Sequence, residues 1–136
     1  MLVKSILIPF LMLFASVLYG QDIRTAHLSW PVTQLQDLRT NATANYSCVF
    51  ETQGAGQLLW KQKAFTTTFT VQNISGTWEN IQTEGKSVFD VAAEGLSGTL
   101  TFERTASGTT IVLDLTEPGG ERIDHRYQVS DIITTN

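Results

Sequence analysis

The feature that most constrains this chain is a strand-like alternation of apolar and polar side chains between regularly spaced turns. In residues 64–71 the side chains of one face are Phe65, Thr67, Phe69 and Val71. Similar alternation recurs in residues 88–91, 99–103, 110–115 and 122–129. Turn signals separate the runs by about 8–12 residues, a spacing typical of sandwiches and barrels. The sequence therefore predicts an all-β fold of about eight short antiparallel strands, closed into a small barrel or strongly curved sheet. A two-sheet β-sandwich is the alternative that periodicity leaves open.

Matching the apolar faces predicts which strand positions lie opposite one another. Phe102 should face Phe89 across a loop around Gly95, and Ile111 across the next hairpin. Leu115 should face Ile123 across the turn that follows it. Because a slip of one residue would turn each apolar face into water, these pairings should be well specified.

One segment lacks the two-residue period. Its apolar side chains recur at three-residue intervals, at Val32, Leu35 and Leu38. Ser29 can cap a helix, and Pro31 is acceptable in a first helical turn. We expect one short helix within residues 30–40, packed on or across the open end of the sheet.

Residues 1–20 have the pattern of a secretory signal peptide. Lys4 precedes an almost wholly apolar stretch at 6–18, and the chain turns polar at Gln21. The stretch is shorter than a membrane span, which needs about 20 residues. We expect cleavage after Gly20, a single all-β domain over residues 21–136, no membrane span after cleavage, and a periplasmic or extracellular location. The residues at the cleavage zone favour a bacterial source.

Charge and cysteine content exclude several functional classes. The chain has nine Lys and Arg against thirteen Asp and Glu, a formal net charge of −4, and no basic stripe. An acidic surface repels phosphate backbones, so we expect no nucleic-acid partner. Cys48 is the single cysteine and cannot close an internal disulfide. It alternates with Tyr46 and Phe50, which favours a small buried side chain over a reactive thiol.

The candidate catalytic groups are few. Asp114 and Asp124 should lie opposite each other on the outer face, close enough to share a proton as carboxylate pairs in some hydrolases do. Arg122 and Arg126 flank Asp124, which favours a neutralised surface ladder. No zinc, phosphate-binding or nucleophile motif occurs, and we expect no cofactor, metal or catalytic residue.

The two histidines have different expected settings. His125 lies on the apolar face between Ile123 and Tyr127, where a hydrogen-bonded core role is the common one. His27 should face solvent.

Three tryptophans are the candidate binding residues, although aromatic rings in a small domain more often fill the core. They are Trp30, Trp60 and Trp78. The preferred hypothesis is an exported, non-enzymatic binding or interaction module with a protein or glycan partner. The alternative is a barrel that carries a small apolar ligand inside it, and a hydrolase using Asp114 and Asp124 ranks third.

Overall fold

A computed structural model describes residues 21–135, which form nine β-strands and no helix. The strands are β1 (His27–Asp37), β2 (Thr43–Gln53), β3 (Gln57–Lys61), β4 (Thr66–Ser75), β5 (Gly85–Ala93), β6 (Leu96–Thr105), β7 (Gly108–Thr116), β8 (Arg122–Val129) and β9 (Ile133–Thr134). The predicted signal peptide lies outside the described residues.

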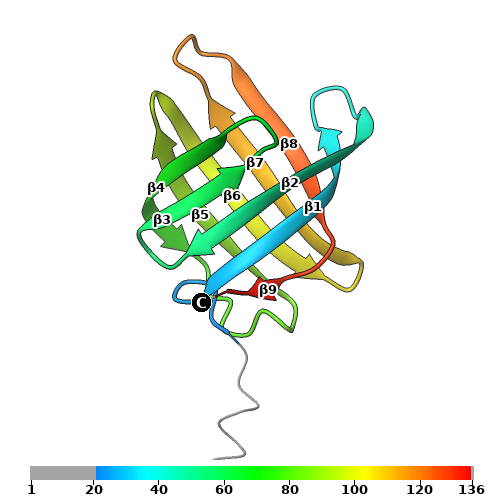
Figure 1. The fold of residues 1–136 in the computed structure, drawn as a ribbon, viewed down its shortest axis with the longest axis vertical. Helices are drawn as coiled ribbons and strands as arrows, with labels where there is room; N and C mark the ends of the chain where they lie inside the picture. Colours follow the sequence, from blue (N-terminus) through cyan, green and yellow to red (C-terminus); the bar gives the residue numbers. More distant parts are fainter. Residues whose placement is uncertain (1–20, 136) are drawn as a thin grey trace, which may run out of the picture.

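The first eight strands close into an antiparallel barrel (Figure 1). Each strand from β1 to β7 pairs with the next one along the chain, and β1 also pairs with β8. The short strand β9 lies alongside Leu28 and Ser29 of β1, where β8 has already ended. The predicted all-β barrel is therefore confirmed, and the sandwich alternative is not adopted by the chain.

The predicted strand register is confirmed at two hairpins and wrong at one. Phe102 lies opposite Ile111, and Leu115 lies opposite Ile123, as expected. Phe89 lies opposite Leu100 instead of Phe102. The cause is a tight two-residue turn at 94–95, whose φ angles are 37° and 86°. Positive φ at both turn residues matches the right-handed twist of a hairpin, and the resulting shift of two positions keeps every side chain on its predicted face.

The predicted helix in residues 30–40 is wrong, because this segment is the second half of strand β1 and the turn after it. The pairing register shifts between Val32 and Gln34, which marks a β-bulge. The extra residue returns Leu35 to the inner face, opposite Tyr127. A bulged strand thus produces the three-residue apolar spacing that resembles a helix. The carbonyl of Pro31 accepts a hydrogen bond from the Ser130 amide, so the backbone of Pro31 points toward the chain after β8. Proline has no N–H to donate, but on this side no hydrogen bond to β2 is lost.

The interior is filled with large apolar side chains, and one end of the barrel is closed. Fully buried rings and aliphatic chains include Trp30, Phe50, Phe69, Phe89, Phe102, Leu58, Leu100 and Ile111. Trp78, on the connection from β4 to β5, packs beneath Trp30 with 5.9 Å between ring centroids. A Cβ at Gly85 would lie 2.1 Å from the Trp78 ring, so this closure depends on a glycine there.

Candidate functional site

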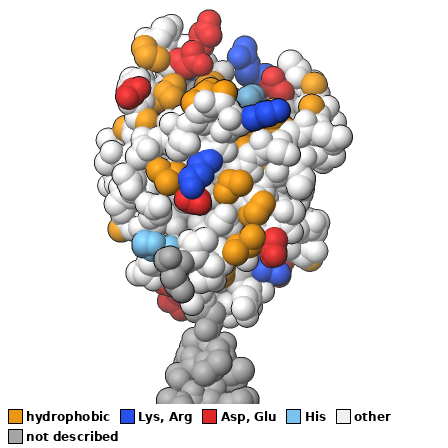
Figure 2. All heavy atoms as spheres, in the orientation of Figure 1, with side chains coloured by type: hydrophobic (Ala, Val, Ile, Leu, Met, Phe, Trp, Pro, Cys, Tyr) orange, Lys and Arg blue, Asp and Glu red, His pale blue; other side chains and the backbone are white. Residues whose placement is uncertain are grey.

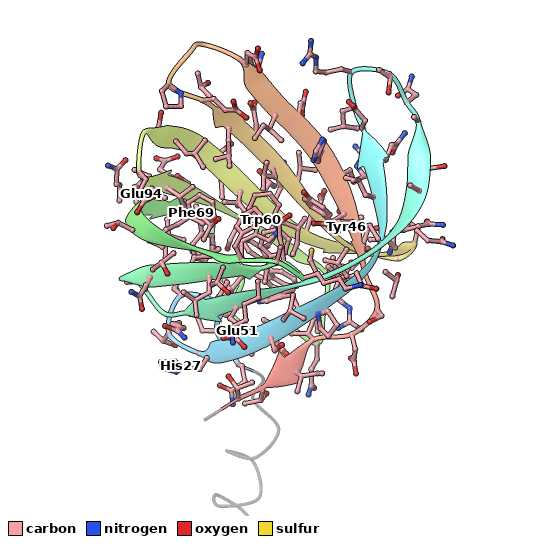
Figure 3. The ribbon with its side chains drawn as sticks, turned by 45° about the horizontal axis from the view of Figure 1, so that its top comes forward. His27, Tyr46, Glu51, Trp60, Phe69 and Glu94 are labelled. Atoms are coloured by element: carbon pink, nitrogen blue, oxygen red, sulfur yellow. The ribbon has the colours of Figure 1, made fainter. Side chains whose placement is uncertain are left out.

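The end of the barrel opposite Trp78 is open. It is bounded by the turns at 38–42, 62–65, 94–95 and 117–121. Several side chains on the inner face are only half-buried here: Leu35, Tyr46, Thr67, Leu96, Ile123 and His125. Figure 3 looks toward this end and shows Tyr46 and Trp60 within the ring of strands, with His27 outside it. Solvent therefore reaches the upper part of the inner wall.

A cleft of about 470 Å³ lies in the rim of this open end, between the start of β4 and the β5–β6 turn. It is lined by Phe65, Thr66, Thr67, Thr68, Ala93, Glu94 and Leu96, and we call it the rim cleft. Phe65 is 59% exposed, more than any other large hydrophobic residue in the described chain. An exposed aromatic ring in a cleft of this size is a common element of binding sites.

The rim cleft exists because β4 and β5 end at different heights. Their pairing begins at Thr70 and Ala92, and a bulge lies just below it, between Val71 and Asn73. The first residues of β4 therefore extend past the end of β5. The β5–β6 turn lies against the β7–β8 turn and not against β4. A Cβ on Gly95 would come within 2.7 Å of Pro118 Cγ. Contact between these two turns leaves the β4 side open.

The backbone of β4 presents unpaired polar groups to the rim cleft. The amide of Val71 donates to Gly56 and the carbonyl of Phe65 accepts from Gln62, so odd-numbered residues of β4 bond to the β3 side. In an antiparallel ladder the even-numbered residues then face the opposite neighbour. The peptide N–H and C=O groups of Thr66 and Thr68 thus point into the cleft, where no described residue of β5 pairs with them.

A second cleft, of about 640 Å³, continues from the rim cleft over the outer face of the barrel. The two share Thr68, Ala93, Glu94 and Leu96, and the second extends past Thr70 and Gln72. Thr68, Thr70 and Gln72, on the outer face of β4, form one side of this continuous surface.

The three tryptophans are all buried and do not form one site. Trp30 and Trp78 lie toward the closed end, and their indole N–H groups donate to Thr52 Oγ1 and to the Thr83 carbonyl, each at 3.0 Å. Trp60 is 7% exposed and stacks on Phe50 with 5.7 Å between ring centroids. Its indole N–H is buried and has no hydrogen-bond partner. Among the described residues, the hydroxyl of Ser87 is the one other buried polar side-chain group without a partner. Ligand binding at the tryptophans stays a prediction.

The side chains around Trp60 combine aromatic surface with weakly acidic groups. Burial raises the pKa of Cys48 to about 11; the nearby indole N–H offsets part of that rise without reaching hydrogen-bond geometry. Burial also raises the pKa of Tyr127 well above its usual range. The Tyr127 hydroxyl lies 3.2 Å from His125 Nδ1, and the Tyr46 hydroxyl donates to Gln62. The expectation of a buried Cys48 is confirmed, and His27 is exposed as predicted. His125 is hydrogen-bonded as expected, but it is half-buried at the open end and does not lie in the core.

The aspartate pair lies where the sequence predicts it, with Asp114 opposite Asp124. Arg122 donates to both carboxylate oxygens of Asp114, at 2.7 and 2.8 Å, and these hydrogen bonds raise the pKa of the Arg122 guanidinium. Arg122 and Asp124 also line a cleft of about 520 Å³ that includes Arg39 and Glu121. Both charge signs alternate across this surface, which matches the neutralised ladder expected from the sequence.

Comparisons with known proteins add no relatives. No family model matches the chain, and neither a curated protein nor a solved structure does. Within residues 21–135, no group of three or more His, Cys, Asp or Glu side chains is arranged to hold a metal ion. The same residues include no helix long and apolar enough to cross a membrane. The proposals below therefore rest on the geometry of the chain itself.

Proposed function

We propose that this protein is an exported, non-enzymatic binding module and that the rim cleft is its binding site. The observation that carries the proposal is the combination of a 59% exposed Phe65 with unpaired backbone groups in one cleft of about 470 Å³. An exposed apolar patch marks a surface that a partner can cover, and an unpaired strand edge is a template for pairing with another chain.

Protein is the better-supported partner class. Sugar stacking on the tryptophans is disfavoured, because Trp30, Trp60 and Trp78 are between 0 and 7% exposed. The exposed ring is Phe65, and the unpaired backbone groups beside it match those of another polypeptide chain. Figure 2 shows that the face over β1–β3 has hydrophobic side chains in separate spots, with few charges. In the rim cleft, by contrast, an exposed ring and free backbone groups lie together in one hollow.

A pair of matched variants tests the site with the neutral dye Nile red. Phe65→Ser removes the exposed ring, whereas Ile133→Ser removes the other exposed large hydrophobic residue, 46% exposed, on β9 away from the cleft. We expect saturable dye binding to weaken about tenfold in Phe65→Ser, a free-energy change of about 1.4 kcal/mol, and to be unaltered in Ile133→Ser. Equal binding by both variants and the unsubstituted protein would refute the assignment.

Export has its own test, which is the mass of the protein recovered outside the cytoplasm of its native host. We expect a chain that begins at Gln21. A recovered chain that still begins at Met1 would contradict the proposed leader.

A second candidate function, carriage of a small apolar ligand at the open end, is favoured by the indole N–H of Trp60, which has no hydrogen-bond partner. Because this N–H is buried and the interior around it is filled, a ligand could reach it only if neighbouring side chains moved. A ligand with a carbonyl oxygen could accept this hydrogen bond while its apolar part contacts the surrounding rings. In an NMR titration with 2-decanone, we expect the Trp60 indole proton to shift. The indole protons of Trp30 and Trp78 are already bonded and serve as internal controls. Equal shifts at all three, or none, would exclude this candidate.

A further inference from the structure

We infer that the rim cleft binds its partner by strand addition, with an extended peptide segment pairing with the free edge of β4. This inference rests on the proposed binding role of the cleft and specifies the chemistry of the partner. It goes beyond apolar recognition because it assigns the binding to main-chain hydrogen bonds.

The spacing of the free groups selects an extended backbone. Thr66 and Thr68 are two residues apart on one strand, so their free N–H and C=O groups repeat at about 6.6–6.8 Å. Another extended chain has donors and acceptors at the same interval, which is how peptides add to exposed sheet edges in other domains. A compact apolar ligand cannot pair with both positions in this way.

The lining of the cleft specifies which side chains the peptide should have. Phe65, Ala93 and Leu96 supply apolar contacts, and Glu94 is the one charged residue in the lining. The peptide should therefore alternate apolar residues with polar ones and place a lysine or arginine near Glu94. Two ladder positions limit the contact to a short segment, consistent with the size of the cleft.

The test uses a random heptapeptide library displayed on phage and selected against the immobilised protein. Thr68→Pro deletes an N–H that faces the cleft and not β3, while Thr68→Val keeps the backbone and replaces the hydroxyl with a methyl group. We expect selected peptides with alternating apolar residues that bind the unsubstituted protein and Thr68→Val, and lose at least about tenfold in affinity to Thr68→Pro. Thr66→Pro repeats the test at the other free position should Thr68→Pro fail to fold.

Three results would overturn strand addition. They are the absence of any enriched peptide, equal binding of the peptides to Thr68→Pro, and a concentration-dependent dimer in light scattering that Thr68→Pro abolishes. The last result would assign the edge to a second copy of the chain. If Nile red binding still depends on Phe65 in any of these cases, the rim cleft remains a binding site and only the peptide chemistry fails.

Discussion

Alkaline pH should destabilise the barrel through one buried thiol. Cys48 is 6% exposed, and burial raises its pKa from 9.0 to about 11. The unfolded chain therefore loses this proton first as pH rises, so the unfolded state binds fewer protons and the free energy of unfolding falls. Each unit by which the pKa in the folded state exceeds that in the unfolded state corresponds to about 1.4 kcal/mol of unfolding free energy. The loss from this group should approach about 2.7 kcal/mol well above pH 11, with about half of that total reached by pH 10 and about 1.9 kcal/mol of it falling between pH 9 and pH 11.

Urea unfolding followed by tryptophan fluorescence measures this loss, with Cys48→Ala as the matched variant. The variant should keep the part of the alkaline loss that comes from Tyr127, whose pKa is raised by burial in the same direction. The difference in unfolding free energy between the two proteins should therefore begin to change near pH 9, before tyrosines of the unfolded chain ionise near pH 10. Parallel stability curves for the two proteins between pH 8 and pH 10 would refute a buried Cys48 of raised pKa.

Further substitutions test the closed end, the exposed ring and the charge ladder. Trp78→Ala should cost about 3–5 kcal/mol in urea unfolding, because it leaves a cavity beneath Trp30. Phe65→Ala should cost less than about 1.2 kcal/mol, since full burial of a phenylalanine is worth about 1.5–3 kcal/mol and this ring is 59% exposed. A larger loss for Phe65→Ala than for Trp78→Ala would reverse the assignment of closed and open ends. Asp114→Asn should leave the urea midpoint unchanged within error, because its ion pair with Arg122 is largely exposed to solvent; a clear shift would show a structural role.

Local alternation carried most of the information about the fold. Because strand side chains alternate strictly, the inward face of β7 and its pairing with β8 could be predicted from residues such as Leu115 and Ile123. The same logic failed at β1, where the bulge after Val32 changes the phase of the alternation. A bulge is stabilised by pairing with two neighbouring strands, so a single strand read in isolation cannot reveal it.

The rim cleft could not be predicted, because it depends on where strands distant in sequence end relative to one another. The sequence placed Phe65 on the inner face, and its exposure follows from the pairing of Thr70 with Ala92. The signal that could have located the cleft is the tight turn at 94–95, which ends β5 only one residue after Ala92. This turn locates the cleft only if the pairing register of β4 with β5 is known, and the bulge after Val71 shifts that register.

Amide hydrogen exchange along β4, measured by NMR, tests the central claim of an open strand edge most directly. The amides of Thr66 and Thr68 should exchange roughly 100-fold faster than those of Thr67 and Phe69, which face β3, and protection should return at Thr70. Uniform protection from residue 66 to residue 70 would show that β4 is paired on both sides. It would contradict the open strand edge and, with it, binding of a partner strand in the rim cleft.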